Sequence, residues 1–199
     1  TNLTADRLTY DTRTGVVTAE GGVHVDQGTG NIEGARAIYN TKTQEGTIEG
    51  NVRAQREDMN LSCDRLLAAG QEHWQAVGDV HMVKAGRTFT GAQVDYYPSQ
   101  NEYILAESGG TITSADGTLS ADCLEGWMKE SRFIGTGNAH LISPPRDLEG
   151  GGDRMEYFAA AEKPYVVLDG SAWILQGNNM ARSNHMTVYL TDDGTAVTK

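Results

Sequence analysis

The sequence has few of the residues that mark several common classes of protein. Proline occurs four times and cysteine twice in 199 residues. Two cysteines do not make a disulfide framework and do not identify a redox compartment. Positive charge is also scarce, because 16 Lys and Arg residues stand against 27 Asp and Glu residues, a formal net charge of -11. Nucleic-acid binding needs a basic surface, so this balance argues against a nucleic-acid partner.

Long apolar runs are missing as well. No stretch approaches the roughly 18 apolar residues that a membrane-spanning helix needs. The chain opens on the strand-like "TNLTADRLTY" without a signal peptide, so an exported protein would have lost its signal. Hydrophobic residues make up 38% and aromatic residues 7% of the chain. Most of the apolar side chains are therefore small or medium-sized. A solid core usually contains more large side chains, so this composition favours an open apolar groove.

Glycine, in contrast, is abundant and regularly placed. A glycine, a second turn residue and a valine recur in "AEGGVHV", "IEGNVRA" and "AVGDVHM", at residues 19–25, 48–54 and 76–82. The bend glycines follow one another at intervals of 28 to 33 residues, at Gly21, Gly50, Gly78, Gly109, Gly137 and Gly170. This period predicts about seven stacked repeats of roughly 29 residues.

Each repeat has the alternation that is typical of β-strands. Apolar residues lie at even offsets on both sides of the bend glycine, as Ala19 and Val23 do around Gly21. One face of the extended chain is therefore apolar and the other polar. At a second recurring position, between the bend glycines, the apolar residues change from odd to even offsets. A strand can change parity in this way only if it contains an extra residue. We therefore expect a bulge or corner at Asp6, Asp64, Asp122 and Asp153. Catalytic carboxylates are the alternative, although a repeated corner accounts for equivalent acids.

The two stretches "LTADRLTYDTRTGVVTAEGGVHV" and "IEGARAIYNTKTQEGTIEGNVRA" resemble the repeat of the OstA-like proteins. This superfamily of lipopolysaccharide-transport proteins in diderm bacteria includes LptA, LptC and the N-terminal domain of LptD. The resemblance implies an all-β fold, an open β-jelly-roll (β-taco) of stacked antiparallel repeats with an apolar interior groove. It implies one domain over residues 1–199, with both terminal repeats interrupted.

The resemblance also implies a function. It is a non-enzymatic periplasmic carrier or bridge without a cofactor, which shields lipopolysaccharide acyl chains on their way to the outer membrane. The expected partners are lipopolysaccharide or a related acylated lipid, and other proteins of this fold that stack edge to edge. Strand parity selects the side chains expected to line the groove: Leu8, Val23, Val25, Leu66, Val80, Met82, Val94, Phe133, Leu141, Met155, Leu168 and Ile174.

Two alternatives to lipid transport stay open. A structural β-solenoid scaffold or assembly module without lipid cargo would fill its interior with its own side chains. A carbohydrate-active β-helix enzyme would need two carboxylates about 5–10 Å apart in a cleft, and no such pair is evident.

Histidine and cysteine positions do not favour a metal site or a disulfide. His24, His81 and His140 each lie three residues after a bend glycine, which resembles a ladder of metal ligands. Strands two steps apart in a sheet are separated by about 10 Å, so surface histidines are the better interpretation. Cys63 and Cys123 lie two repeats apart, too far for a disulfide.

Overall fold

The structure, a computed structural model, describes residues 2–26, 28–70, 72–190 and 196–198. These residues form antiparallel strands and one 3-10 turn, η1 (Pro144–Arg146). The predicted all-β fold is thereby confirmed. Among the described residues, no helix is long and apolar enough to cross a membrane. The chain divides into two compact units, an N-terminal unit of residues 1–98 and a C-terminal unit of residues 99–199. One domain over 1–199 stays a prediction.

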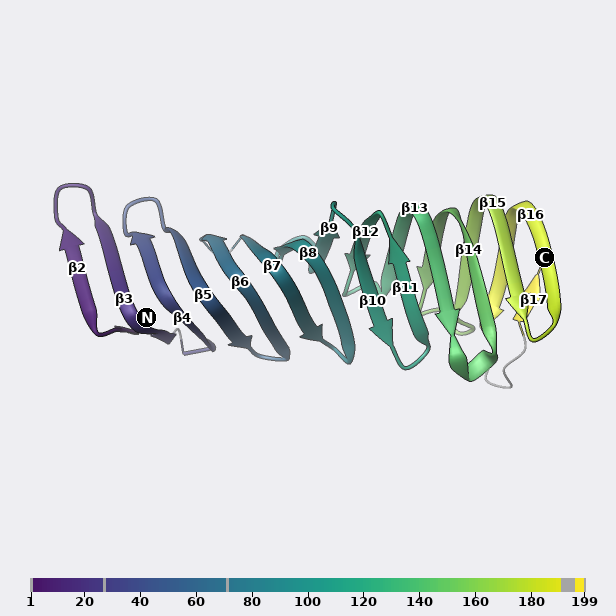
Figure 1. Cartoon of the computed structure of the whole chain (residues 1–199), viewed down its shortest axis with the longest axis horizontal. Coiled ribbons are helices and arrows are strands. Elements are labelled where there is room, and N and C mark those ends of the chain that lie inside the picture. Colours follow the sequence, from purple (N-terminus) through teal and green to yellow (C-terminus); the bar gives the residue numbers. More distant parts are fainter. Residues whose placement is uncertain (1, 27, 71, 191–195, 199) are drawn as a thin grey trace. The chain divides into compact units, whose positions relative to one another are not determined.

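The N-terminal unit is a meander in which, from β2 to β8, each strand pairs with the next along the chain (Figure 1). The first strands, β1 and β2, both pair with β3, so together they make one interrupted strand. The strands are β1 (Asn2–Thr4), β2 (Arg7–Asp11), β3 (Val16–Asp26), β4 (Gly30–Asn40), β5 (Glu45–Arg56), β6 (Met59–Ala69), β7 (His73–Lys84) and β8 (Arg87–Tyr97).

The C-terminal unit has the same plan. Here β11 and β12 pair with successive halves of β13, and β9 and β10 flank them. The strands are β9 (Tyr103–Ala106), β10 (Gly110–Ser114), β11 (Gly117–Ala121), β12 (Cys123–Trp127), β13 (Arg132–Ser143), β14 (Leu148–Phe158), β15 (Tyr165–Gln176), β16 (Asn179–Leu190) and β17 (Ala196–Thr198). The interrupted C-terminal repeat that the sequence predicts lies partly outside the described residues; β17 pairs with β16.

A pair of left-handed residues bends the long strands in the middle. In β7, Gly78 and Asp79 have φ values of 80° and 43°, and the register with β6 shifts there. The same pair of positive φ values recurs at Gly21–Gly22, Gly50–Asn51, Gly137–Asn138 and Gly170–Ser171. Glycine comes first because a Cβ at Gly78 would overlap with the Asp64 carboxylate and lie 2.8 Å from the Asp64 Cβ. The register also shifts at Asp64 and Asp153, and the strands are interrupted at Asp6 and Asp122, so the predicted corners are confirmed.

The bend gives each unit two limbs with an apolar interior between them. In the N-terminal unit, limb 1 comprises residues 7–11, 16–20, 36–40, 45–49, 65–69, 73–77 and 93–97. Limb 2 comprises residues 2–4, 23–26, 30–33, 52–56, 59–62, 80–84 and 87–91. Apolar side chains alternate along both limbs, so each limb contributes one apolar face to the interior.

Candidate lipid-binding groove

Two rows of apolar side chains face each other in the N-terminal unit. The register of limb 1 joins Leu8, Ala19, Ala37, Ile48, Leu66, Ala76 and Val94 across successive strands. The register of limb 2 joins Leu3, Val25, Ile32, Ala54, Leu61, Met82 and Phe89. Directly paired side chains lie on the same face of a sheet, so each row forms a continuous apolar strip.

The two rows enclose a cavity of about 400 Å³ at the β1–β7 part of the unit. Its lining is mostly apolar and comes from both limbs: Leu3, Val25, Thr29, Ile32, Ala37, Ile38, Tyr39, Gln44, Gly46, Thr47, Ile48, Arg56, Leu66, Ala68, Gly70 and Trp74. Ile38 and Tyr39 are each 40% exposed, so the cavity communicates with solvent at this side. An apolar cavity of this kind, with few polar groups, suits an aliphatic chain.

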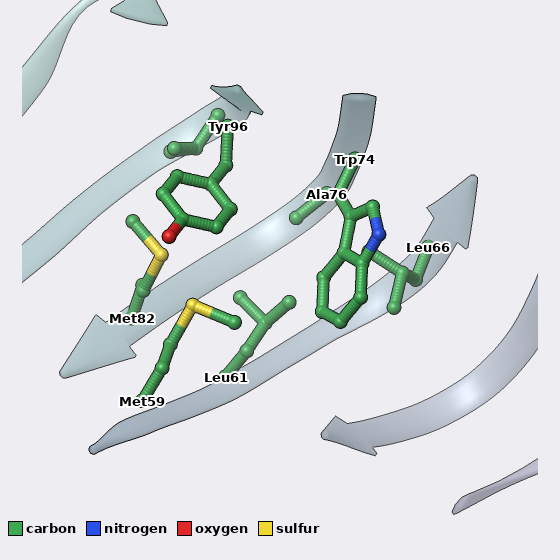
Figure 2. A pocket seen from close by; sticks show the side chains of 8 residues that line it. Met59, Leu61, Leu66, Trp74, Ala76, Met82 and Tyr96 are labelled. Atoms are coloured by element: carbon green, nitrogen blue, oxygen red, sulfur yellow. The ribbon is translucent and has the colours of Figure 1, made fainter. Parts of the chain in front are cut away.

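Trp74 and Leu66 form one end of this cavity. Both also line a much smaller space of about 10 Å³ beyond, where the interior is filled. Figure 2 shows Met59, Met82 and Tyr96 pointing toward one another in that space. A volume of about 10 Å³ holds about one water molecule, so the groove is effectively closed beyond Trp74.

Arg56 introduces a charge into the otherwise apolar lining. It lies two residues beyond Ala54 on β5 and therefore on the interior face. Its guanidinium Cζ lies 5.6 Å from the ring centroid of Trp74, so limb 2 contacts limb 1 through a cation–π pair. The Trp74 indole N–H is buried and has no hydrogen-bond partner among the described residues. The cavity thus has one cation and one unused donor at the same place.

The interior of the C-terminal unit is filled by its own side chains. Phe133, Met155 and Val166 are completely buried, and Leu168 is almost so. In this unit limb 1 comprises residues 103–106, 123–127, 132–136, 154–158, 165–169 and 185–190, and limb 2 comprises residues 110–114, 117–121, 139–143, 148–151, 172–176 and 179–183.

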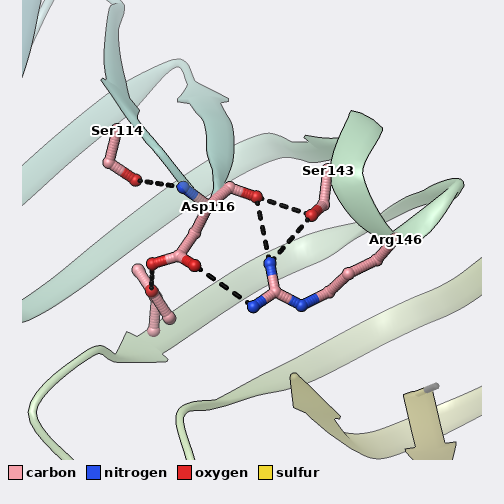
Figure 3. Close-up of polar contacts among 5 residues, drawn as sticks. Ser114, Asp116, Ser143 and Arg146 are labelled. Atoms are coloured by element: carbon pink, nitrogen blue, oxygen red, sulfur yellow. Dashed lines mark hydrogen bonds and ion pairs between the residues drawn. The ribbon is translucent and has the colours of Figure 1, made fainter. Parts of the chain in front are cut away.

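A polar cluster joins the free edges of the two limbs in the C-terminal unit (Figure 3). Asp116, in the turn at the end of limb 2, accepts a hydrogen bond of 2.9 Å from the Tyr157 hydroxyl of limb 1. Arg146 of η1 pairs with the Asp116 carboxylate at 3.1 Å, and the Ser143 hydroxyl donates to the Asp116 carbonyl at 2.5 Å. Ser143 is fully buried. This cluster fastens the two edges to each other in the C-terminal unit.

Comparison with known proteins identifies the family. The family model described as "LptA/(LptD N-terminal domain) LPS transport protein" matches residues 31–193. The chain belongs to this LPS-transport family. A second model, described as "Lipopolysaccharide-assembly, LptC-related", matches residues 1–57. No curated protein matches the chain.

A solved structure also matches this member of the LPS-transport family. It is LptH, the LptA homologous periplasmic component of the lipopolysaccharide transport device from Pseudomonas aeruginosa. The match has 18% sequence identity and a TM-score of 0.48, and it covers 53% of this chain and 80% of LptH.

The twelve residues that the sequence selected as groove lining lie on interior faces of the structure. Leu8 is 51% exposed because β2 is an edge strand, but it pairs with the buried Ala19 and shares its face. Val25 is partly exposed and lines the large cavity with Leu66. The remaining nine are buried: Val23, Val80, Met82, Val94, Phe133, Leu141, Met155, Leu168 and Ile174. Lipid contact at all twelve stays a prediction.

Several cavity residues do not appear among the sequence-selected ones. Ile48 and Ala37 lie in the same row as Leu66, and their even offsets from the bend would have identified them. Arg56 has the same parity as Val52 and Ala54, but its charge conceals that it faces the interior. Trp74 closes the groove through its size, which parity does not indicate.

The three histidines lie beside carboxylates or are exposed, and the two cysteines are separate thiols. His24 and His140 lie 3.4 Å and 2.8 Å from Glu33 and Glu149 on neighbouring strands of the outer face, and His81 is exposed. Cys63 and Cys123 are not bonded to each other. Burial raises the pKa of the Cys63 thiol to about 11, so at neutral pH this thiol is protonated.

Proposed function

We propose that this member of the LPS-transport family carries the acyl chains of lipopolysaccharide, or a related acylated lipid, in the groove of the N-terminal unit. The observation that carries the proposal is the cavity of about 400 Å³ lined by apolar side chains of both limbs. Each buried CH₂ group contributes roughly 0.8 kcal/mol, so ten of them would contribute about 8 kcal/mol. Such a site binds a chain without a covalent step, and the protein acts as a carrier, not an enzyme.

The open edge of the N-terminal unit supports a role as a bridge in the periplasm. All five residues of β2 are exposed, including Leu8 at 51% and Tyr10 at 55%. Edge strands with apolar side chains favour addition of a strand from another chain. We infer that proteins of the same fold stack on this edge, which would extend the groove from one molecule to the next.

A structural scaffold without cargo is the second candidate. The filled interior of the C-terminal unit favours it for that part of the chain, because Phe133 and Met155 occupy the space between the limbs. A lipid carrier would hold an acyl chain in the N-terminal cavity, whereas a scaffold would hold no lipid there.

Site-specific photo-crosslinking in a diderm bacterium distinguishes them. A benzophenone amino acid at Ile32, which lines the cavity, is compared with the same group at the adjacent Glu33, which pairs with His24 on the outer face. The proposal predicts an adduct with an acylated lipid, identified by mass spectrometry, at position 32 and not at 33. Adducts at neither position would support the scaffold.

A further inference from the structure

A row of cations lies beside the apolar row of limb 2. The register pairs Arg56 with Met59, Met59 with Lys84, and Lys84 with Arg87. Each lies two residues outward from a member of the apolar row, so it has the same facing. One step of about 7 Å beyond its aliphatic row, the interior face of limb 2 therefore carries three cations together with Met59.

Lys84 is the most buried of the three cations. It is 5% exposed, and its ammonium nitrogen lies 2.7 Å from a carboxylate oxygen of Asp58. The Asp58 side chain is 56% exposed, and the hydrogen bond from Lys84 holds the pKa of that carboxyl below its usual value. At the edge of the interior, an exposed carboxylate therefore compensates the Lys84 ammonium group.

Arg56 connects this row with the cavity. It lines the cavity, and its guanidinium lies over the indole of Trp74, whose buried N–H has no partner among the described residues. On the neighbouring strand Arg56 pairs with Gly30, which has no side chain to cover it. An acceptor group entering here would meet a guanidinium and an unused indole donor together.

The charge of the row is specific to the N-terminal unit. The equivalent third interior positions after the bends of β13 and β15 are Ser143 and Gln176, which are uncharged. The chain carries a formal net charge of -11, so three cations in one interior row run against its composition. Of the three, Arg56 lines the cavity.

We propose that Arg56, Lys84 and Arg87 bind the phosphate of an acylated amphiphile whose chain occupies the cavity. The inference rests on the proposed function and adds the site of the anionic headgroup. Arg56 lies two strand steps, about 10 Å, from Lys84, and Arg87 lies one step of about 4.8 Å farther, so the three long side chains border one stretch of the edge, where a group with several acceptor oxygens would meet them. Asp58 compensates Lys84 in the empty protein, and the phosphate replaces it when lipid is bound.

Isothermal titration with two amphiphiles of equal chain length tests this site. Dodecyl phosphate supplies the anion, dodecyl maltoside has a neutral headgroup, and inorganic phosphate is the third arm. We expect the wild-type protein to bind dodecyl phosphate more tightly than dodecyl maltoside and to bind inorganic phosphate far more weakly. Arg56→Gln should lower the affinity for dodecyl phosphate about tenfold and leave dodecyl maltoside unchanged.

Three further variants separate charge from folding. Arg53→Gln removes an exposed cation on the outer face of the same strand and should change neither affinity. Lys84→Met should lower dodecyl phosphate binding, and Lys84→Arg should retain it. Equal affinity for both amphiphiles in the wild type, or an equal loss for both in Arg56→Gln, would overturn the headgroup site alone. Failure of both amphiphiles to bind would overturn the proposed function with it. Inorganic phosphate binding as tightly as dodecyl phosphate would overturn the assignment to a headgroup.

Discussion

The bend glycines are the residues on which the repeat depends most directly. Gly21, Gly50, Gly78, Gly137 and Gly170 each have a positive φ and stand against a side chain, as Gly78 does against Asp64. The predicted bend glycine Gly109 also has a positive φ, but it lies between β9 and β10, and a Cβ there would meet only the Ala121 carbonyl oxygen at 3.8 Å. Any side chain at this position meets both a strained backbone and an occupied space. That double requirement explains why the same short phrase returns along the chain.

Gly78→Ala should lower the free energy of unfolding by at least about 2 kcal/mol more than Gly86→Ala does. Both glycines are left-handed, with φ values of 80° and 73°, so the backbone cost is similar in the two variants. A Cβ at Gly86 meets open space, whereas one at Gly78 would lie 2.8 Å from the Asp64 Cβ. Urea denaturation of both variants measures the difference; equal losses would contradict the role given to Asp64.

At the scale of elements, the bent strand determines which side chains face the interior. Val80 is 1% exposed and the adjacent His81 is exposed, as alternation on either side of the bend requires. The bend keeps the apolar side of both limbs turned to the same interior.

Val80→Asp should therefore be strongly destabilising, by several kcal/mol, because it buries a carboxylate without a partner. His81→Asp should change the free energy of unfolding by no more than about 0.5 kcal/mol. Thermal unfolding followed by circular dichroism tests the pair, and similar damage from both substitutions would show that the facing of β7 is wrong.

The polar cluster of the C-terminal unit is an element-scale feature that fastens two limbs. Tyr157→Phe should lower the free energy of unfolding by about 1 kcal/mol, because it removes the hydroxyl that donates to Asp116 and keeps the ring. Tyr10→Phe, which removes an exposed hydroxyl from β2, is the matched control and should have no measurable effect. Chemical denaturation measures both; a neutral Tyr157→Phe would mean that packing alone holds the limbs together.

Local chemistry explains how far the sequence predicts this fold. The strands bend at pairs such as Gly-Asn and Gly-Asp, and apolar residues alternate on both sides of each bend. Both features depend on neighbouring residues in the chain, so the sequence predicted where the strands lie and which side chains face the interior. The cluster of Asp116 and Tyr157 joins residues 41 positions apart, and the sequence did not predict it. Whether a stretch of interior stays open depends on large side chains from different strands, as Trp74 and Tyr96 show.

At the scale of the whole molecule, two units share one architecture and differ in what fills it. The N-terminal unit keeps a cavity of about 400 Å³ with a cation at its edge, whereas the C-terminal unit closes around Phe133 and Met155. The membership in an LPS-transport family gives the open unit its proposed cargo. The central claim is that an acyl chain occupies this cavity.

Fluorescence of Trp74 tests that claim most directly, because its indole lines the cavity and the chain has only two other tryptophans. A Trp127→Phe/Trp173→Phe variant leaves Trp74 as the sole indole. It is titrated with an amphiphile brominated along its alkyl chain, with the unbrominated amphiphile for comparison and a Trp173-only variant as the control. The account predicts saturable quenching of Trp74 by the brominated chain alone, and none in the Trp173-only protein. Absence of saturable quenching, or equal quenching of both indoles, would contradict it.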